Sequence, residues 1–236
     1  MNEEFRRTDL RFATEPFGLS VRGAALEWVP PKECCRILIL AGQHGEEPET
    51  TVSLSRALRS LASPPDHVGC VLAANPDGLT LGTRGNAHGV DLNRNFPTAD
   101  WQEANVGVRW HVDEPGSGKL PIGTGSSPGS EPETRALIDL IDRHCPEQVI
   151  ALHAPLACID DPLDSPAGRW LSERTGLPLV TEIGYPTPGS FGTWAAERGL
   201  PVITWEFPKR SIEDLSRDAV PVLIQILEGG MEGLLG

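Results

Sequence analysis

Apolar residues fall into short runs along the chain, and the central runs are continuous rather than alternating. A continuous run is typical of a strand that is covered on both faces of a sheet, so we expect buried strands over residues 37–41, 68–74, 148–152 and 201–205. A further strand is expected over residues 178–183, and one or two peripheral strands over residues 19–28. Polar residues follow several of these runs, at the position where an open parallel sheet binds its ligands.

Between the runs, apolar residues recur at the spacing of a helix. This spacing predicts helices over residues 49–61, 165–175, 192–198 and 212–227, and another helix after Ser130. Ser130 and Glu133 have the spacing of a capping box, in which each side chain bonds the other residue's backbone N–H. Residues 79–130 show no clear period, which is typical of a long functional or disordered loop, and a turn at residues 75–78 precedes them.

The alternation of strands and helices predicts an α/β fold with a mixed, mostly parallel central sheet between helical layers. At 236 residues the chain is long enough to bury the core of one such domain. Length gives no reason for a second domain, so we expect a single domain over residues 1–236.

The composition narrows the class of protein. The formal net charge of −13 argues against a surface for nucleic acid or acidic membranes. The polar N-terminal residues do not resemble a secretory signal, and no run reaches the roughly 18 apolar residues of a spanning helix. Five cysteines, an odd number lying mostly in or beside apolar runs, are typical of reduced thiols. We therefore expect a cytoplasmic protein without a nucleic-acid or membrane partner, and the sequence leaves its oligomeric state open.

A histidine three residues before a glutamate can bring two metal ligands together, and this spacing occurs three times. His44 and Glu47 follow the first buried strand after Gly42, a residue that permits a tight turn. His111 lies in the irregular region with no strand to position it. His144 ends a predicted helix, where the helix dipole favours a cation. We therefore take His44 and Glu47 alone as candidate metal ligands.

Two further polar residues are positioned by buried strands. His153 follows the strand over residues 148–152, and adjacent strands of an α/β sheet would bring it to His44 and Glu47. This set of two histidines and one glutamate leaves a fourth zinc position for water. Glu206 follows the last strand among apolar neighbours, where a carboxylate is costly unless it is paired or functional. Beside zinc, it could take the proton of the metal-bound water.

These residues belong to a series of motifs between about residue 36 and residue 208. The series comprises His44-x-x-Glu47, Asn75-Pro76-Asp77-Gly78, Gly89-Val90-Asp91-Leu92-Asn93-Arg94-Asn95-Phe96, Ser130-Glu131-Pro132-Glu133-Thr134, Leu152-His153, Gly189-Ser190-Phe191-Gly192-Thr193-Trp194 and Glu206. In this order the motifs resemble the zinc carboxypeptidases of the M14 type, and more closely the murein peptide amidase A group. No single motif would carry that resemblance alone.

The resemblance implies a zinc-carboxypeptidase-like fold and one Zn²⁺ per chain, held by His44, Glu47 and His153. It implies that Glu206 acts as general base and later as proton donor. Arg84 resembles the arginine that stabilises the tetrahedral oxyanion, although the loop that carries it is shorter than in the digestive carboxypeptidases.

The resemblance also implies residues that bind substrate. Asn93 and Arg94 match the pair that holds the terminal carboxylate, and a guanidinium can grip a carboxylate with two hydrogen bonds. Tyr185, the only tyrosine, could match a mobile tyrosine that closes over the substrate, or it could be a packing residue. Asp160 and Asp161 could receive the ammonium of diaminopimelate, or they could form an Asx-type turn.

The reaction implied by the resemblance is zinc-dependent hydrolysis of the γ-D-glutamyl-meso-diaminopimelate amide in murein tripeptide, a small peptide of peptidoglycan recycling. A deacylase of the succinylglutamate desuccinylase or aspartoacylase kind is the alternative, because it shares the His-x-x-Glu and Asp-Leu-Asn-Arg elements. The segments Gly189–Trp194 and Thr204–Pro208 favour the peptidase. A metal-free peptide-binding module is a third possibility.

Overall fold

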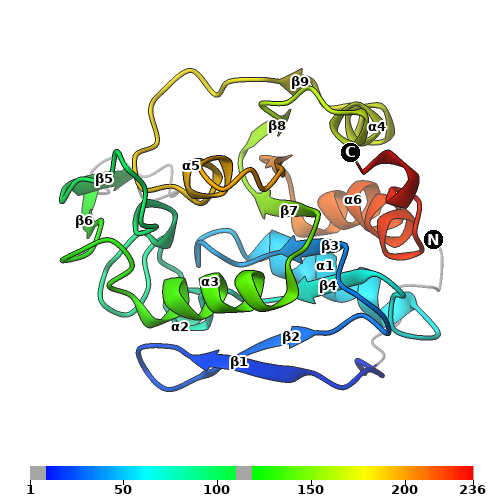
Figure 1. Cartoon of the computed structure of the whole chain (residues 1–236), viewed down its shortest axis with the longest axis horizontal. Helices are drawn as coiled ribbons and strands as arrows, with labels where there is room; N and C mark the ends of the chain where they lie inside the picture. Colours follow the sequence, from blue (N-terminus) through cyan, green and yellow to red (C-terminus); the bar gives the residue numbers. More distant parts are fainter. Residues whose placement is uncertain (1–8, 110–118, 236) are drawn as a thin grey trace.

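A computed structural model describes residues 9–109 and 119–235 of the chain (Figure 1). The strands are β1 Glu15–Leu19, β2 Ala25–Val29, β3 Ile37–Leu40, β4 Val68–Val71, β5 Asn105–Arg109, β6 Lys119–Gly123, β7 Gln148–His153, β8 Leu156–Asp160, β9 Leu179–Val180 and β10 Val202–Pro208. The α-helices are α1 Pro48–Ser60, α2 Pro76–Leu81, α3 Pro132–His144, α4 Pro166–Thr175, α5 Phe191–Ala196 and α6 Ile212–Leu227. Short 3₁₀ helices cover Leu92–Arg94 and Glu232–Leu234.

One mixed sheet has the strand order β1-β2-β4-β3-β7-β10-β8-β9, with β1 and β9 at its two edges (Figure 1). Its centre is parallel, because β3 pairs with β4 and β7 in parallel and β7 pairs in parallel with β10. The strands β1, β2 and β8 add antiparallel ladders around this centre. The predicted mixed, mostly parallel sheet is confirmed. Because β3, β7 and β10 run parallel, their carboxyl ends lie on the same side of the sheet.

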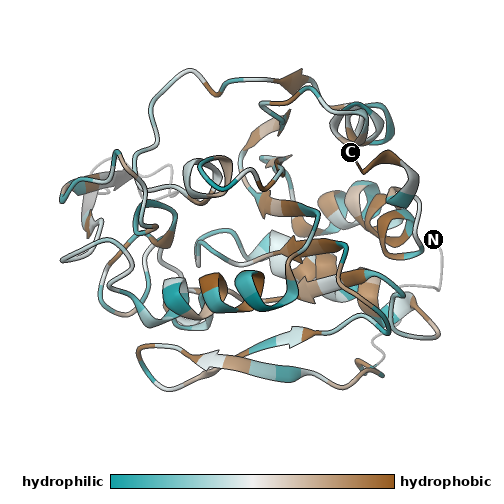
Figure 2. Ribbon diagram, in the orientation of Figure 1, coloured by the Kyte–Doolittle hydropathy of each residue, from teal (hydrophilic) through white to brown (hydrophobic). Residues whose placement is uncertain are grey.

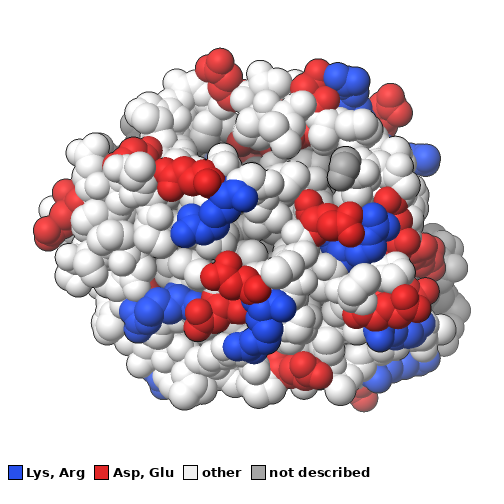
Figure 3. All heavy atoms as spheres, in the orientation of Figure 1, with Lys and Arg blue, Asp and Glu red and all other residues white. Residues whose placement is uncertain are grey.

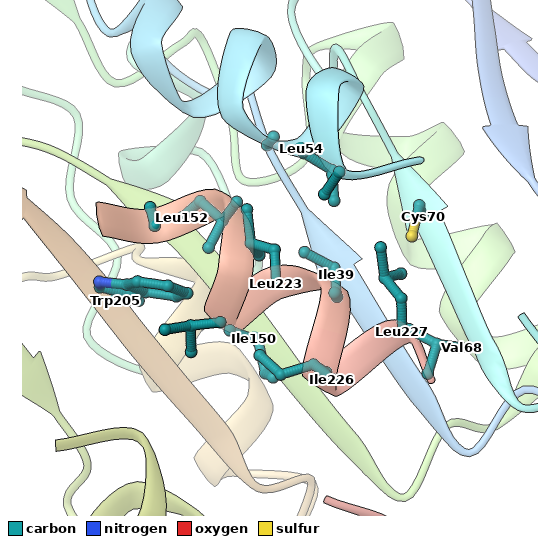
Figure 4. Packing of buried hydrophobic residues seen from close by; sticks show 14 of the residues in the cluster. Ile39, Leu54, Val68, Cys70, Ile150, Leu152, Trp205, Leu223, Ile226 and Leu227 are labelled. Carbon is teal, nitrogen blue, oxygen red and sulfur yellow. The ribbon is translucent and has the colours of Figure 1, made fainter. Parts of the chain in front are cut away.

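Helices cover both faces of the sheet, because successive side chains of a strand point to opposite faces. Ile37 and Ile39 lie in a core with residues of α1, α4 and α6, and Figure 4 shows part of this packing. Leu38 and Leu40 lie in a second core with residues of α3 and α5. Figure 2 shows apolar central strands and a hydrophilic outer side of α3. The continuous apolar run of β3 is therefore explained by burial on both faces.

The predicted helices are present, with ends that lie within two residues of the expected ones, but the predicted capping box before α3 is wrong. The Ser130 hydroxyl donates to Glu131 instead of accepting from the helix. The carboxylate of Glu133 accepts from the Val21 N–H and from Asn86. Glu133 bonds these distant partners instead of forming the local cap, and α3 begins at Pro132 without a side-chain cap.

The segment from residue 79 to residue 130 is more regular than expected. Its first residues belong to α2, which begins at Pro76 in place of the expected turn at residues 75–78 and is capped by Asn75. The segment also contains the antiparallel strand pair of β5 and β6. Strand β8 was also missed, because it is short and lies between Pro155 and acidic residues. The peripheral strands β1 and β2 flank a turn at residues 20–24, which lies inside the segment expected to be extended.

Of the two other histidine motifs, the one at His144 lies among the described residues, which form no metal-ligand cluster besides that of His44, Glu47 and His153. His144 ends α3, and its ring lies 4.4 Å from that of Trp28, while His111 lies outside the described residues. On the face in Figure 3, the described Lys and Arg side chains are interspersed with Asp and Glu, and they form no continuous basic patch. Among the described helices, none is both long and apolar enough to cross a membrane.

Candidate metal centre and cleft

Three buried side chains converge at the carboxyl edge of the central strands. His44 and Glu47 lie between β3 and α1, and His153 is the last residue of β7. His44 Nδ1 lies 2.9 Å from Glu47 Oε1 and 3.2 Å from His153 Nδ1, and His153 Nδ1 lies 3.1 Å from Glu47 Oε2. One ligand atom from each residue lies within 4.8 Å of the other two. The structure therefore brings together the predicted metal ligands.

Glycines shape the segment that carries His44 and Glu47. Gly42 has φ +63°, as expected for a tight turn after β3. Gly45 was not predicted to matter, yet a Cβ atom there would lie 1.9 Å from the backbone carbon of Gly78. The chain around Gly45 can approach α2 this closely only without a side chain. Glycine at position 45 thus helps to place the two ligands on either side of it.

The charges around His44 and Glu47 favour a cation. Burial and Arg84 oppose protonation of His44, but Glu47 and Asp91 outweigh them and raise its pKa to about 9. Burial alone would raise the pKa of Glu47, but His44 and His153 hold it well below its usual value. The carboxylates that favour a proton on His44 also favour a metal ion at the same point, so the residues fit a divalent metal.

Asp91 orients His44, a role that the sequence did not reveal. It is fully buried, and its Oδ1 lies 3.2 Å from His44 Nε2 and accepts from the Asn93 N–H at 2.8 Å. Its Oδ2 accepts from Arg84 Nε at 2.7 Å. A carboxylate on the second ring nitrogen fixes the tautomer of a histidine ligand, which leaves His44 Nδ1 for the metal. Arg84 lies next to the ligands, with Nη1 3.6 Å from Glu47 Oε1.

A buried amide anchors the loop between Arg84 and Asp91. Asn86 Nδ2 donates to Glu131 at 2.7 Å and to Glu133 at 3.0 Å, so it ties the loop to the start of α3. Asn86 Oδ1 accepts from backbone N–H groups two and four residues further on. The loop is therefore held from both sides, and Arg84 and Asp91 keep fixed positions beside His44.

Glu206 lies beside His153, because these two residues are register partners on β10 and β7. Its Oε2 accepts from the Leu156 N–H at 3.2 Å. Burial, together with the nearby charge of Glu47, raises the pKa of Glu206, whereas His153 opposes the rise. The strand pairing thus brings a carboxylate of raised proton affinity next to the ligand set.

A cleft of about 710 Å³ opens over these groups. It is lined by the three candidate ligands, by Arg84 and Glu206, and by the predicted substrate residues Asn93, Arg94, Tyr185 and Asp160. Asn93 Oδ1 accepts from the Phe191 N–H at 2.8 Å, which fixes the orientation of its amide. Tyr185 is 53% exposed at the cleft, so it is not a core packing residue.

The two neighbouring aspartates have different surroundings. Asp161 is buried and does not line the cleft, because its carboxylate accepts from the Leu163 N–H and from the N–H and hydroxyl of Ser165. The expected contact of Asp161 with substrate is thus replaced by a turn before α4. Asp160 faces the cleft, and burial, followed by the charges of Glu206 and Asp161, raises its pKa to about 6.

Comparisons with known proteins agree with this geometry. The family model described as zinc carboxypeptidase matches residues 29–159. Murein peptide amidase A of Escherichia coli K12 is 47% identical over 91% of this chain and 89% of its own length. The crystal structure of murein-tripeptide amidase from Escherichia coli O157 superposes with a TM-score of 0.87 at 46% identity, covering 94% of each chain. Thrombin activatable fibrinolysis inhibitor, 18% identical, shares the fold with a TM-score of 0.71 over 94% of this chain and 71% of its own.

Proposed function

The chain belongs to the zinc carboxypeptidase family, and we propose that it hydrolyses the amide between γ-D-glutamate and meso-diaminopimelate in murein tripeptide. One observation carries this proposal: the chain is 47% identical to a murein peptide amidase over 91% of its length. Its candidate catalytic groups also line one cleft, as the reaction requires. The substrate is a small peptide, which suits a cleft of about 710 Å³.

His44, Glu47 and His153 would hold one Zn²⁺ per chain. Their donor set, two imidazole nitrogens and one carboxylate, is typical of catalytic zinc sites that keep a position open. When bound, zinc polarises the scissile carbonyl and lowers the pKa of a water molecule toward neutrality. Asp91 keeps the ring of His44 in the orientation that binding requires.

Glu206 would move the proton. Its carboxylate stands beside His153, so it can accept a proton from the attacking water and then deliver that proton to the leaving amine. The raised pKa of Glu206 suits this exchange, because a group that must both accept and release a proton works best with a pKa near the operating pH. The N–H of Leu156 holds the carboxylate in place.

Four further residues would bind and orient the peptide. Asn93 and Arg94 would hold the carboxylate next to the scissile amide, with Arg94 making two parallel hydrogen bonds to it. Arg84 would stabilise the negative charge that develops on the carbonyl oxygen, because Asp91 already fixes its guanidinium at the cleft. Tyr185, exposed at the cleft, would cover the bound substrate.

We also propose that the enzyme acts in the cytoplasm and that its partner is a small peptide substrate, not a nucleic acid or a membrane. The cysteines Cys34, Cys35, Cys70, Cys145 and Cys158 are all free, which supports a reducing compartment.

Parallel assays on murein tripeptide and on N-acyl amino acids test the proposal against a deacylase. Release of free diaminopimelate from L-Ala-γ-D-Glu-meso-diaminopimelate, abolished by a chelator and restored by zinc, is the expected result. Turnover of N-acyl amino acids without turnover of the tripeptide would overturn the proposal. Binding of the tripeptide with no cleavage in the zinc-loaded protein would favour a peptide-binding module instead.

A further inference from the structure

Positive and negative side chains are unevenly placed in the cleft. Among the described lining residues, the Lys and Arg side chains are Arg84 and Arg94, and both interact with the charge of Asp91. Asp160 lies on β8, which follows β7 and β10 in the order of the sheet. The cleft therefore carries the positive charges of Arg84 and Arg94 beside Asp91. It carries the negative charge of Asp160 on β8, the strand next to the one that carries Glu206.

The carboxylate of Asp160 has no hydrogen-bond or ion-pair partner among the residues that the structure describes. It lies in the cleft lining and accepts no hydrogen bond from the described residues. Its charged neighbours are Glu206 and Asp161, which are carboxylates too. Its partner in the β10 register is Thr204, which also lines the cleft and carries no charge.

A half-buried carboxylate beside two others is unfavourable unless a cation balances it. Among the described residues that line the cleft, the Arg side chains are those of Arg84 and Arg94, and both interact with Asp91 rather than with Asp160. A positive charge on the substrate would balance the Asp160 carboxylate. An ammonium group suits the place, because it can donate three hydrogen bonds to the carboxylate and neighbouring oxygens.

We propose that Asp160 determines the specificity of the cleft by binding a side-chain ammonium of the substrate. The distal carboxylate of diaminopimelate would contribute little, because no described Lys or Arg lines that part of the cleft. The substrate class is then γ-D-glutamyl amides of amino acids whose side chain ends in an ammonium. It includes meso-diaminopimelate, its form with an amidated distal carboxylate, and L-lysine. This inference rests on the proposed function.

Three peptides that differ only at the distal end test the proposal. L-Ala-γ-D-Glu is joined to meso-diaminopimelate, to L-lysine, or to L-2-aminopimelate, which keeps the distal carboxylate but lacks the ammonium. For the wild-type enzyme we expect kcat/KM for the lysine peptide within about tenfold of the diaminopimelate peptide. We expect the aminopimelate peptide to be poorer by about 10- to 100-fold, the effect of one hydrogen bond to a charged group.

Asp160→Asn keeps the shape of the side chain and removes its charge. It should lower kcat/KM for the two ammonium peptides by about 10- to 100-fold and leave the aminopimelate peptide unchanged or improved. Asp164→Asn is the matched control, because Asp164 is exposed outside the cleft and pairs with Arg169. This control should match the wild type on all three peptides.

The possible outcomes distinguish failure of the proposed role of Asp160 from failure of the proposed amidase function. Wild-type enzyme that cleaves the diaminopimelate peptide but is more than about 100-fold slower on the lysine peptide would overturn the proposal, because the distal carboxylate would then be recognised. An equal loss on all three peptides in Asp160→Asn would also overturn it. If Asp160→Asn does not fold, the wild-type ranking of the three peptides still decides. Failure of the wild type on every peptide would refute the proposed function itself.

Discussion

Replacing Asp91 with Asn tests how the candidate metal centre is held together. The fully buried carboxylate contacts His44 and Asn93 through Oδ1 and Arg84 through Oδ2. An asparagine side chain keeps the Oδ1 contacts but turns an N–H₂ group toward Arg84 Nε, where two donors then face each other. The substitution therefore removes one charge-assisted hydrogen bond and weakens the orientation of His44.

The size of the effect follows from these contacts. Loss of a hydrogen bond between charged groups costs about 1.5–3 kcal/mol of unfolding free energy. Weaker orientation of a histidine ligand lowers metal affinity about 10- to 100-fold, which corresponds to about 1.4–2.7 kcal/mol of binding free energy. Urea unfolding measures the first quantity on the metal-free protein, and competition with a zinc chelator measures the second.

Asp77→Asn is the control. Asp77, a residue of α2, is also a buried carboxylate, and it accepts from the Ser20 hydroxyl and the Arg22 N–H in the β1–β2 turn. This variant should lose stability but keep the zinc affinity of the wild type. Equal zinc affinity in Asp91→Asn and wild type would show that Asp91 does not orient His44 for the metal. Equal losses of zinc affinity in Asp91→Asn and Asp77→Asn would show that the loss comes from a general effect on folding.

Three further predictions concern packing and pH. Gly45→Ala would place a Cβ atom 2.0 Å from the carbonyl oxygen of Gly78, so we expect urea unfolding to show a loss of about 1–3 kcal/mol or more in unfolding free energy. Gly233→Ala is the control, because the space around Gly233 is open, and it should unfold like the wild type. Equal urea midpoints for Gly45→Ala and the wild type would contradict the predicted clash. Burial opposes ionisation of Glu131, but hydrogen bonds from Asn86, Ser130 and His88 outweigh it and lower the pKa of Glu131, so its stabilising effect should be present above about pH 4.5 and lost at lower pH. The stability difference between wild type and Glu131→Gln should therefore shrink as the pH falls from 6 to 3, and a constant difference would contradict this role. Since the pKa of Asp160 is raised to about 6, the preference for the diaminopimelate peptide over the aminopimelate peptide should be present above pH 6 and fall below it, and a preference independent of pH between 5 and 8 would contradict an ionised Asp160.

The strands and helices that show a clear pattern of apolar residues along the sequence were predicted well. The run Ile37 to Ala41 and the run before His153 are apolar because both faces of those strands are covered, and this signal is visible in the sequence. Helix α6 was predicted at its observed bounds, since its apolar stripe is long and regular. The candidate metal ligands could also be predicted from the sequence, because they lie at or just beyond the ends of such strands.

The missed features depend on contacts between distant residues. Asp91 bonds His44, which is 47 positions away, and nothing near Asp91 in the sequence indicates that contact. Glu133 has the spacing of a capping residue but bonds Asn86 and the β1–β2 turn. Asp160 and Asp161 are neighbours with the same side chain, yet one faces the cleft and the other holds a turn. Only the fold separates their roles.

We propose that this chain is a zinc-dependent amidase whose proton transfer relies on Glu206. The most direct test titrates zinc into metal-free wild type and metal-free Glu206→Gln while free diaminopimelate released from murein tripeptide is measured. We expect wild-type activity to rise to a plateau at one zinc per chain, and we expect the variant to bind one zinc with similar affinity but to stay inactive. Full activity without zinc, or a variant as active as the wild type, would contradict this proposal.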